Sequence, residues 1–295
     1  MTAGCCLALT ARSHAALFTN SVSIDAFVRS NAPTVNYGGA GSLTISGATA
    51  TNGLGAINGI ADSFIRFDTA ALMASLNSQY GPGSWLINGV TLRVVEVGAP
   101  SNNIFTRGKG AFSAFWISND DWIEGSGMPM TPTADGITYT NESTLLTNTA
   151  SLGTFTNAAA NSTNFYSLLL PPPFLDDISA GGEVGLYFTA ASPEIGFTFD
   201  SQNFNTASQR PVLIISAVQR PTSLGISLAG SNLSITATNV AAGKMYLLLS
   251  TTDPFAPVDQ WHPVSTNLPA ENGEISISQP IAPETTQQYF ILQAQ

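Results

Sequence analysis

The sequence has little charge, and this scarcity excludes several classes of protein. Only 9% of the 295 residues are charged, against about 25% in a typical soluble domain. Lysine occurs only at Lys109 and Lys244, so the charged faces that long helices present to water are missing. Long apolar runs are missing as well, and because no stretch of about 18 apolar residues occurs, we expect no transmembrane segment.

Basic residues are the scarcer charged type, which argues against nucleic acid as a partner. Nine Lys and Arg stand against nineteen Asp and Glu, and the formal net charge is −10 at pH 7. Phosphate backbones are bound by concentrated patches of Lys and Arg. The arginines here are spread from Arg12 to Arg220, so we expect no nucleic-acid partner.

Cysteine and histidine are nearly absent, and both cysteines and one of the two histidines lie in the first fifteen residues. Cys5, Cys6 and His14 belong to a segment, residues 1–15, that is similar to a secretory signal peptide. A short apolar stretch is followed by small residues at Ser13 and Ala15, the positions that a signal peptidase reads. Cleavage after Ala15 would leave no thiol. The alternative is that the apolar stretch forms a buried strand.

The mature chain would then carry a single histidine, His262, and this limits its chemistry. Cysteine nucleophiles and Cys/His zinc sites are excluded for such a chain. His262 follows Trp261 in a strand-like context and is interpreted as a surface histidine beside a core tryptophan. We therefore expect a non-catalytic protein. The alternative is a polysaccharide-cleaving enzyme that uses paired carboxylates, such as Asp121 and Glu124.

What is abundant is the composition of an all-β protein. Hydrophobic residues make up 44% of the chain and include 16 Phe, which is enough to build a core. Ten short apolar alternations bounded by turn residues predict a large jelly-roll-like β-sandwich over residues 16–220. Shorter alternations follow and predict a small immunoglobulin-like β-sandwich over residues 221–295.

Local patterns refine this prediction. One helix is expected over residues 68–76, where a capping residue precedes a run of Ala, Leu and Met. Phe64 and Leu92 lie in the clearest alternations and are expected to face the sandwich core. The acids Asp176 and Asp177 follow three prolines and are interpreted as part of a solvated turn.

Short motifs in the predicted large domain occur in the order typical of one family. They are Asp25-Ala-Phe-Val-Arg29, Asn36-Tyr37-Gly38, Ser63-Phe-Ile-Arg-Phe-Asp68, Val90-Thr-Leu-Arg93, Asp121-Trp-Ile-Glu-Gly125, Asp135-Gly-Ile-Thr138 and Arg210-Pro-Val-Leu213. Through them the domain resembles the DNRLRE domain, a disaggregatase-related family close to carbohydrate-binding module family 96. The resemblance implies a jelly-roll-like sandwich that contacts polysaccharide. It extends to exported bacterial proteins that often carry PEP-CTERM sorting tails, a motif that the end of this sequence does not match.

The segment 119–125 concentrates acids around an indole and is the first candidate site. Trp122 could stack on a sugar while Glu124 accepts hydrogen bonds from its hydroxyls. Asp120 and Asp121 could ligate a structural calcium ion, but their spacing does not match an EF-hand loop. Any calcium site must therefore include distant acids, for which Asp25 and Asp200 are the candidates. The alternative is that Trp122 begins a core strand and the acids belong to a turn.

Further ligand-binding candidates lie outside that segment. Tyr37 is predicted in a loop, where an exposed ring could contact a ligand. Arg29, Arg66 and Arg93 lie on three predicted strands, and a shared face would bind carboxylated sugars. The alternative is that each arginine pairs with a nearby acid.

These patterns together predict an exported protein, secreted or held at the cell surface. Its expected role is non-catalytic, either binding polysaccharide or forming a surface matrix. A purely structural role in an envelope or fibre is the remaining alternative. The sequence does not indicate an oligomeric state.

Overall fold

The protein is all-β, with two α-helices among the residues that the computed structural model describes. The described residues are 7–9, 15–52, 55–97, 110–157, 162–220, 223–229, 232–240, 243, 245–269, 273–280 and 288–294. By internal packing the chain divides into two compact units. The large unit comprises Leu17–Ala74 and Ile87–Ser216, and the small unit comprises Met1–Ala16, Ser75–Leu86 and Ala217–Gln295.

The elements up to residue 220 are β1 (Leu7–Leu9), β2 (Ala16–Ser21), β3 (Ile24–Arg29), β4 (Ser42–Ser46), β5 (Ala61–Asp68), α1 (Ala70–Tyr80), β6 (Trp85–Val95), β7 (Gly110–Ile117), η1 (Glu142–Thr144), β8 (Thr149–Asn157), β9 (Thr163–Ser167), α2 (Pro172–Ala180), β10 (Glu183–Ala190), β11 (Gly196–Asp200), η2 (Ala207–Gln209) and β12 (Val212–Gln219). Those that follow are β13 (Ser223–Ala229), β14 (Asn232–Val240), β15 (Tyr246–Thr251), η3 (Val258–Gln260), β16 (His262–Asn267), β17 (Gly273–Pro280) and β18 (Tyr289–Ala294).

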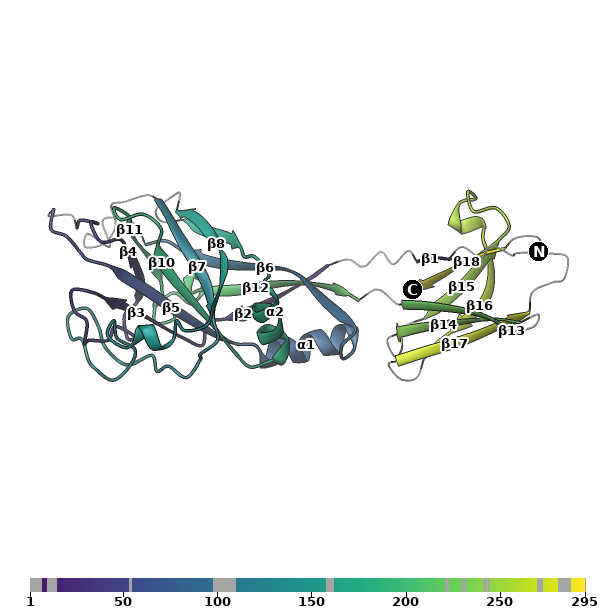
Figure 1. Ribbon diagram of the computed structural model, residues 1–295, viewed down its shortest axis with the longest axis horizontal. Coiled ribbons are helices and arrows are strands. Elements are labelled where there is room, and N and C mark those ends of the chain that lie inside the picture. The colour runs from purple at the N-terminus through teal and green to yellow at the C-terminus, as the bar shows by residue number, and fades with distance from the viewer. Residues whose placement is uncertain are drawn as a thin grey trace. The chain divides into compact units, whose positions relative to one another are not determined.

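Two sheets form the sandwich of the large unit. One has seven strands in the order β11-β4-β5-β10-β7-β8, with β3 also paired to β5, and the other has the order β2-β12-β6-β9 (Figure 1). The sheets pack face to face: the ring of Phe112 on β7 meets Tyr166 on β9 edge-on, with centroids 5.1 Å apart. Leu92 of β6 is buried in this interior, as predicted.

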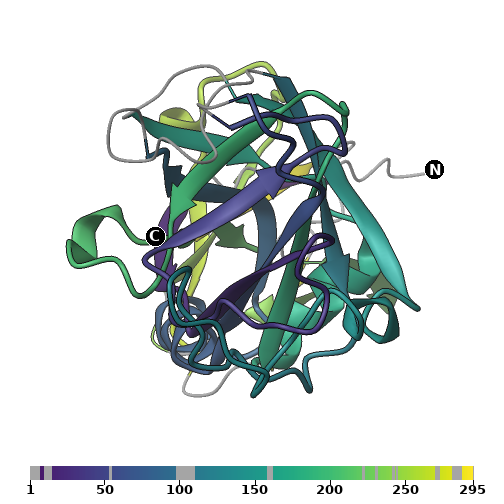
Figure 2. The same ribbon diagram turned by 90° about the vertical axis from the view of Figure 1, so that its left-hand side faces the viewer.

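The large unit has a second core on the outer face of its seven-stranded sheet. Phe64 is buried, but it packs with Trp122, Ile137 and Leu145 rather than in the sandwich interior. These three residues belong to a long loop, residues 118–148, which joins β7 to β8 and lies against β3 and β5. Figure 2 shows the same loop from the end of the large unit. The expected orientation of Phe64 was therefore wrong, because a loop covers the face that alternation assigns to solvent.

The helices differ from expectation in extent and number. The helix α1 begins where predicted, with the Asp68 carboxylate accepting a hydrogen bond from the amide of Ala70, but it continues to Tyr80. The acids Asp176 and Asp177, which were predicted to lie in a solvated turn, lie instead in the helix α2. Proline is favourable in a first helical turn because it has no amide hydrogen to lose there, and Gly181 ends the helix with φ of 74°. Asp177 is accordingly ordered and accepts a hydrogen bond from Trp116 Nε1 at 2.6 Å.

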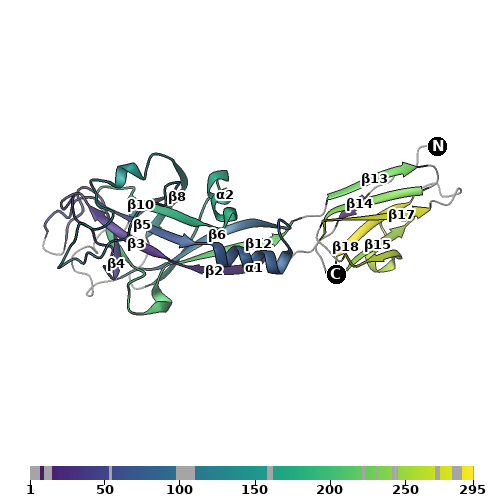
Figure 3. The same ribbon diagram turned by 90° about the horizontal axis from the view of Figure 1, so that it is seen from below.

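The small unit is a second sandwich. Its sheets have the orders β1-β18-β15-β16 and β13-β14-β17 (Figure 3). Alternate residues of both sheets, including Ile235, Leu248 and Phe290, meet in one buried cluster. The strand β1 pairs in parallel with β18, which corresponds to the alternative of an apolar strand near the N-terminus. Cys5, Cys6 and most of the signal-peptide-like segment lie outside the described residues.

The predicted domain boundary lies close in sequence to the one that internal packing defines. The sequence places the boundary at 220–221, whereas packing divides the chain after Ser216 and assigns Ser75–Leu86 to the small unit. Among the described sheets, only the one that contains β1 combines strands from both sides of residue 220, because β1 pairs with β18. Neither described α-helix is long and apolar enough to cross a membrane.

Candidate functional site

The loop 118–148 carries the candidate site, and a single buried side chain organises its path. Asn36 is completely buried and makes four hydrogen bonds. Its Nδ2 donates to the carbonyls of Glu124 at 2.6 Å and Ile137 at 2.8 Å, and its Oδ1 accepts from the amides of Gly38 at 2.9 Å and Gly127 at 3.3 Å. An Asn amide can satisfy donors and acceptors together, so this residue ties two passes of the loop to the segment after β3.

Glycines allow this close packing of backbone on backbone. A Cβ on Gly38 would lie 2.0 Å from the carbonyl oxygen of Glu124, and one on Gly127 would lie 1.8 Å from that of Asn36. Gly125 also has a positive φ of 78°, which other residues rarely adopt. The motifs Asn36-Tyr37-Gly38 and Glu124-Gly125 are therefore explained by packing.

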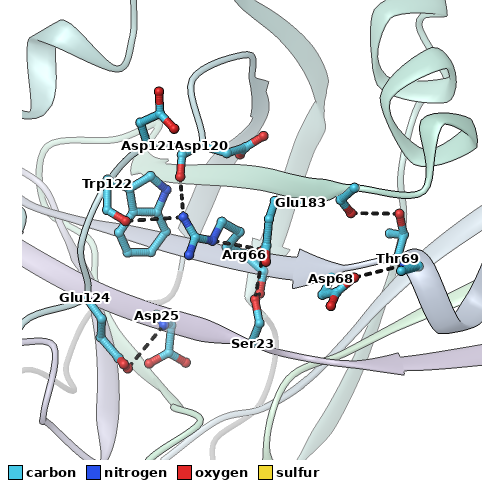
Figure 4. A network of polar contacts seen from close by, with 12 residues as sticks. Ser23, Asp25, Arg66, Asp68, Thr69, Asp120, Asp121, Trp122, Glu124 and Glu183 are labelled. Carbon is cyan, nitrogen blue, oxygen red and sulfur yellow. Dashed lines mark hydrogen bonds and ion pairs between the residues drawn. The ribbon is translucent and has the colours of Figure 1, made fainter.

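An arginine anchors the start of the loop to the sheet (Figure 4). Arg66 Nη1 donates to the carbonyls of Asp120 and Trp122, and its Nε lies 3.0 Å from the Glu183 carboxylate. The guanidinium carbon is 5.5 Å from the centroid of the Trp122 ring, within the range of a cation–π contact. Arg66 therefore contacts Trp122 twice, through a hydrogen bond to its carbonyl and through a cation–π contact with its ring.

A cleft of about 380 Å³ opens within the loop. Ten residues line it: Asp121, Trp122, Ile123, Ala134, Asp135, Gly136, Ile137, Asn141, Thr144 and Leu145. The volume lies at the lower end of the range for small-ligand sites, about 300–1,000 Å³. Apolar walls alternate with carboxylate, amide and hydroxyl groups, and no Lys or Arg is among the lining residues.

Two groups in the cleft have contrasting environments. Trp122 Nε1 is buried and has no hydrogen-bond partner among the described residues, and Figure 4 shows it turned toward the side where Asp121 lies. Asp135 instead accepts hydrogen bonds from the hydroxyl and amide of Ser126 and from the hydroxyl of Thr133. These donors lower the pKa of Asp135 to about 2. The cleft is therefore lined by a carboxylate that remains charged and by a tryptophan whose N–H is buried without a partner among the described residues.

The structure corrects the two aromatic predictions. Tyr37 is buried and stacks on Phe27, with ring centroids 4.6 Å apart and planes inclined by 7°, so it presents no face to a ligand. Trp122 is also buried, with 5% of its surface exposed, and cannot act as an open stacking platform. It begins no strand, because the loop continues on both sides of it. It is nevertheless one of the residues that line the cleft.

The three arginines do not share a face. Arg29 on β3 donates to the carbonyl of Asn58 at 3.2 Å, and Arg93 on β6 in the other sheet donates to that of Arg210 at 2.9 Å. Arg66 pairs with the acid Glu183, which agrees with the alternative that the arginines pair with acids. A single arginine face for carboxylated sugars is therefore excluded by the topology.

The four acids predicted to hold calcium do not converge. Within the described ranges no three His, Cys, Asp or Glu side chains are placed to hold a metal ion. Asp25 lies near the turn after β11, as expected, because its carboxylate accepts from the amide of Gln202 at 2.6 Å. Asp120 instead lies near Arg66 and Asp177, and its pKa rises to about 7 through burial and that neighbouring acid. Asp200 is buried at the end of β11, and burial raises its pKa to about 7.

The proposed acid pair is separated in space. Glu124 Oε1 accepts from Gln202 Nε2 at 2.6 Å, Asn203 Nδ2 at 3.1 Å and the amide of Asp25 at 3.3 Å. Asp121 is exposed at the cleft, and Figure 4 places the two carboxylates on opposite sides of Trp122. They do not face each other across a groove, as glycoside hydrolysis requires.

Several cleft residues were missed by sequence reasoning. Asn141 and Thr144 belong to a polar stretch without periodicity, and nothing in that stretch indicates which residues face inward. Asp135 lies in the motif Asp135-Gly-Ile-Thr138, and that motif by itself indicates no binding role for it. Their proximity to Asp121 arises from two turns of the loop, which local patterns do not encode.

The fold and the cleft together define an all-β protein with two compact units and a polar cleft in one long loop. No known family model matches the chain, and no curated protein is significantly similar to it.

Proposed function

We propose that this is an exported, non-catalytic protein that binds polysaccharide, in a surface matrix or as a secreted component, through the cleft in loop 118–148. The cleft itself carries the proposal. Its exposed Asp121 carboxylate and its apolar wall at Leu145 suit the hydroxyls and C–H faces of a sugar. The Trp122 N–H, which is buried without a partner among the described residues, would donate to a sugar after a local shift of the loop. The resemblance to DNRLRE domains and the weakly charged surface agree with this role.

The ligand expected in the cleft is uncharged rather than acidic. Asp121 and Asp135 line it without a basic residue, and the chain as a whole carries a net charge of −10. Such a surface repels polyanions, so affinity has to come from hydrogen bonds and apolar contact. Binding should then change little between 0.1 and 1 M salt, over which the Debye length falls from about 10 to about 3 Å.

Retention on immobilised glycans tests the proposal. Neutral polysaccharides and an alginate-like acidic polymer would be compared at both salt concentrations. Trp122→Phe keeps the ring and removes the N–H, so it should weaken neutral-glycan binding about 2- to 10-fold, the loss of one net hydrogen bond. Trp85→Phe is the matched control, because Trp85 Nε1 donates to Asn77 and Trp85 is not among the residues that line the cleft.

Other outcomes point to other functions. Retention on no glycan would favour the purely structural role in an envelope or fibre. Salt-sensitive binding to the acidic polymer that is lost in Arg66→Ala would replace the cleft by an arginine-dependent site. Release of shortened sugars would favour the enzyme alternative, for which Asp121 and Glu124 are not suitably placed.

A further inference from the structure

One buried carboxylate lies in the loop 118–148, and another lies on the strand β5 that this loop covers. Asp62 is on β5 with 3% of its surface exposed, and Glu142 opens the short helix η1 of the loop with 8% exposed. Asp62 lies on the same face of β5 as Phe64, two residues on, which packs against the loop. Burial of two acids is costly unless each charge is compensated.

The two acids interact with each other and with hydroxyl groups. The pKa of Glu142 is raised to about 8 by burial and by the charge of Asp62. The pKa of Asp62 is raised to about 6 by burial, although hydrogen bonds from Thr189 and Tyr187 oppose the change. The pKa of Tyr139 is raised by burial and, to a lesser extent, by the charges of Glu142 and Asp62, so its ring lies near both carboxylates. Asp62, Glu142 and the two tyrosines therefore form one cluster drawn from β5, β10 and the loop.

The described part of the chain supplies no basic partner to this cluster: the groups that act on the pKa of Asp62 and of Glu142 include no Lys or Arg. One oxygen of each carboxylate, Asp62 Oδ1 and Glu142 Oε2, is buried without a hydrogen-bond partner. A few such groups occur in any protein, but two in one cluster require an explanation.

A bound cation accounts for these observations better than a proton does. A proton on Glu142 would remove one of the two charges but would leave the Asp62 carboxylate without a compensating positive charge. A hard cation offers both oxygens a ligand position and compensates both charges. The hydroxyls of Thr189 and Tyr187 would orient Asp62 as outer-shell groups do in metal sites.

We propose that Asp62 and Glu142 form a binding site for a hard divalent cation of the calcium type, which ties the loop 118–148 to β5. The two carboxylates supply the protein's charged ligands, and water and neighbouring oxygens complete the coordination. Neither carboxylate lines the cleft, although Glu142 lies in sequence between Asn141 and Thr144, which do.

Calcium binding to the full chain tests this proposal. After dialysis against EDTA, equilibrium dialysis with Ca²⁺ should show a saturable site, and Tb³⁺ should give luminescence excited through the nearby tyrosines. Glu142→Gln and Asp62→Asn keep the side-chain shapes and remove one charge each, so each should weaken binding by about 100-fold. Both remove a buried repulsion and are expected to fold. Glu194→Gln, at an exposed position, is the matched control and should bind normally.

Three results would overturn the proposal. The first is the absence of saturable Ca²⁺ or Tb³⁺ binding by the unmodified chain. The second is calcium binding that survives Glu142→Gln but is lost in Asp25→Asn, which would move the site to the network around Glu124. The third is unfolding at alkaline pH that Glu142→Gln abolishes and Ca²⁺ does not influence, which would assign a proton to the pair.

Discussion

Replacing Asn36 by Ala should detach the loop that carries the cleft, and the structure allows the cost to be worked out. The change removes four hydrogen bonds and leaves two amides and two carbonyls of the backbone without a partner. Each buried group left unsatisfied costs about 1–3 kcal/mol. Because part of the loop can relax and admit water, we expect a total loss of about 3–5 kcal/mol in the free energy of unfolding.

Urea denaturation measures this loss, and hydrogen exchange locates it. Unfolding would be followed by tryptophan fluorescence and by far-ultraviolet circular dichroism. The amides of Gly38 and Gly127 donate to Asn36, so both should exchange faster in the variant while the amides of β6 keep their protection. Asn148→Ala, at an exposed position of the same loop, is the control and should stay within about 0.5 kcal/mol of the unmodified protein.

A small effect would refute the reasoning. If Asn36→Ala changes the free energy of unfolding by less than 1 kcal/mol, or if exchange at Gly38 and Gly127 is unaltered, Asn36 does not organise the loop. A second variant, Asn36→Asp, keeps the acceptor and replaces the donor by an oxygen that faces two carbonyls. It should be at least as damaging as Ala at pH 7 if the donors matter.

Three further predictions concern the packing and charge of the large unit. Gly38→Ala should lower the free energy of unfolding in urea by about 1–3 kcal/mol, since the added Cβ would lie 2.0 Å from a carbonyl oxygen. An unchanged free energy of unfolding would contradict this close approach. Leu92→Ala and Phe64→Ala should each cost about 2–5 kcal/mol, and only the Phe64 change should alter the fluorescence of the loop tryptophan, whose ring is 6.0 Å away. The pKa of Asp135 should be about 2 by NMR titration and rise toward 3.8 in Ser126→Ala. Because folding lowers this pKa, the contribution of Asp135 to stability is present above pH 4 and declines as the pH falls toward 2. An unchanged pKa of Asp135 in Ser126→Ala would exclude the Ser126 hydroxyl as the cause of the shift.

Much of the fold could be predicted because its signals are local. Alternation of apolar residues marks strands such as β5 and β6, since successive side chains of a strand point to opposite faces. A capping residue before an Ala-rich run marks α1. The helix α2 was missed although its signal is present, since proline in a first turn and Gly181 after the last are ordinary helix boundaries.

Sequence alone determined the class of the protein: scarce charge, abundant Ser, Thr and Asn, and period-two alternation suffice for an all-β chain with two sandwiches. Only the tertiary structure decided which residues meet. It buried Tyr37 and Trp122, separated Arg93 from Arg66 into different sheets, and brought Asp62 beneath Glu142, which lies 80 positions later in the chain. The reason is physical: composition and periodicity report on the residues within one strand or helix, whereas a site depends on how a loop without periodicity packs on a sheet.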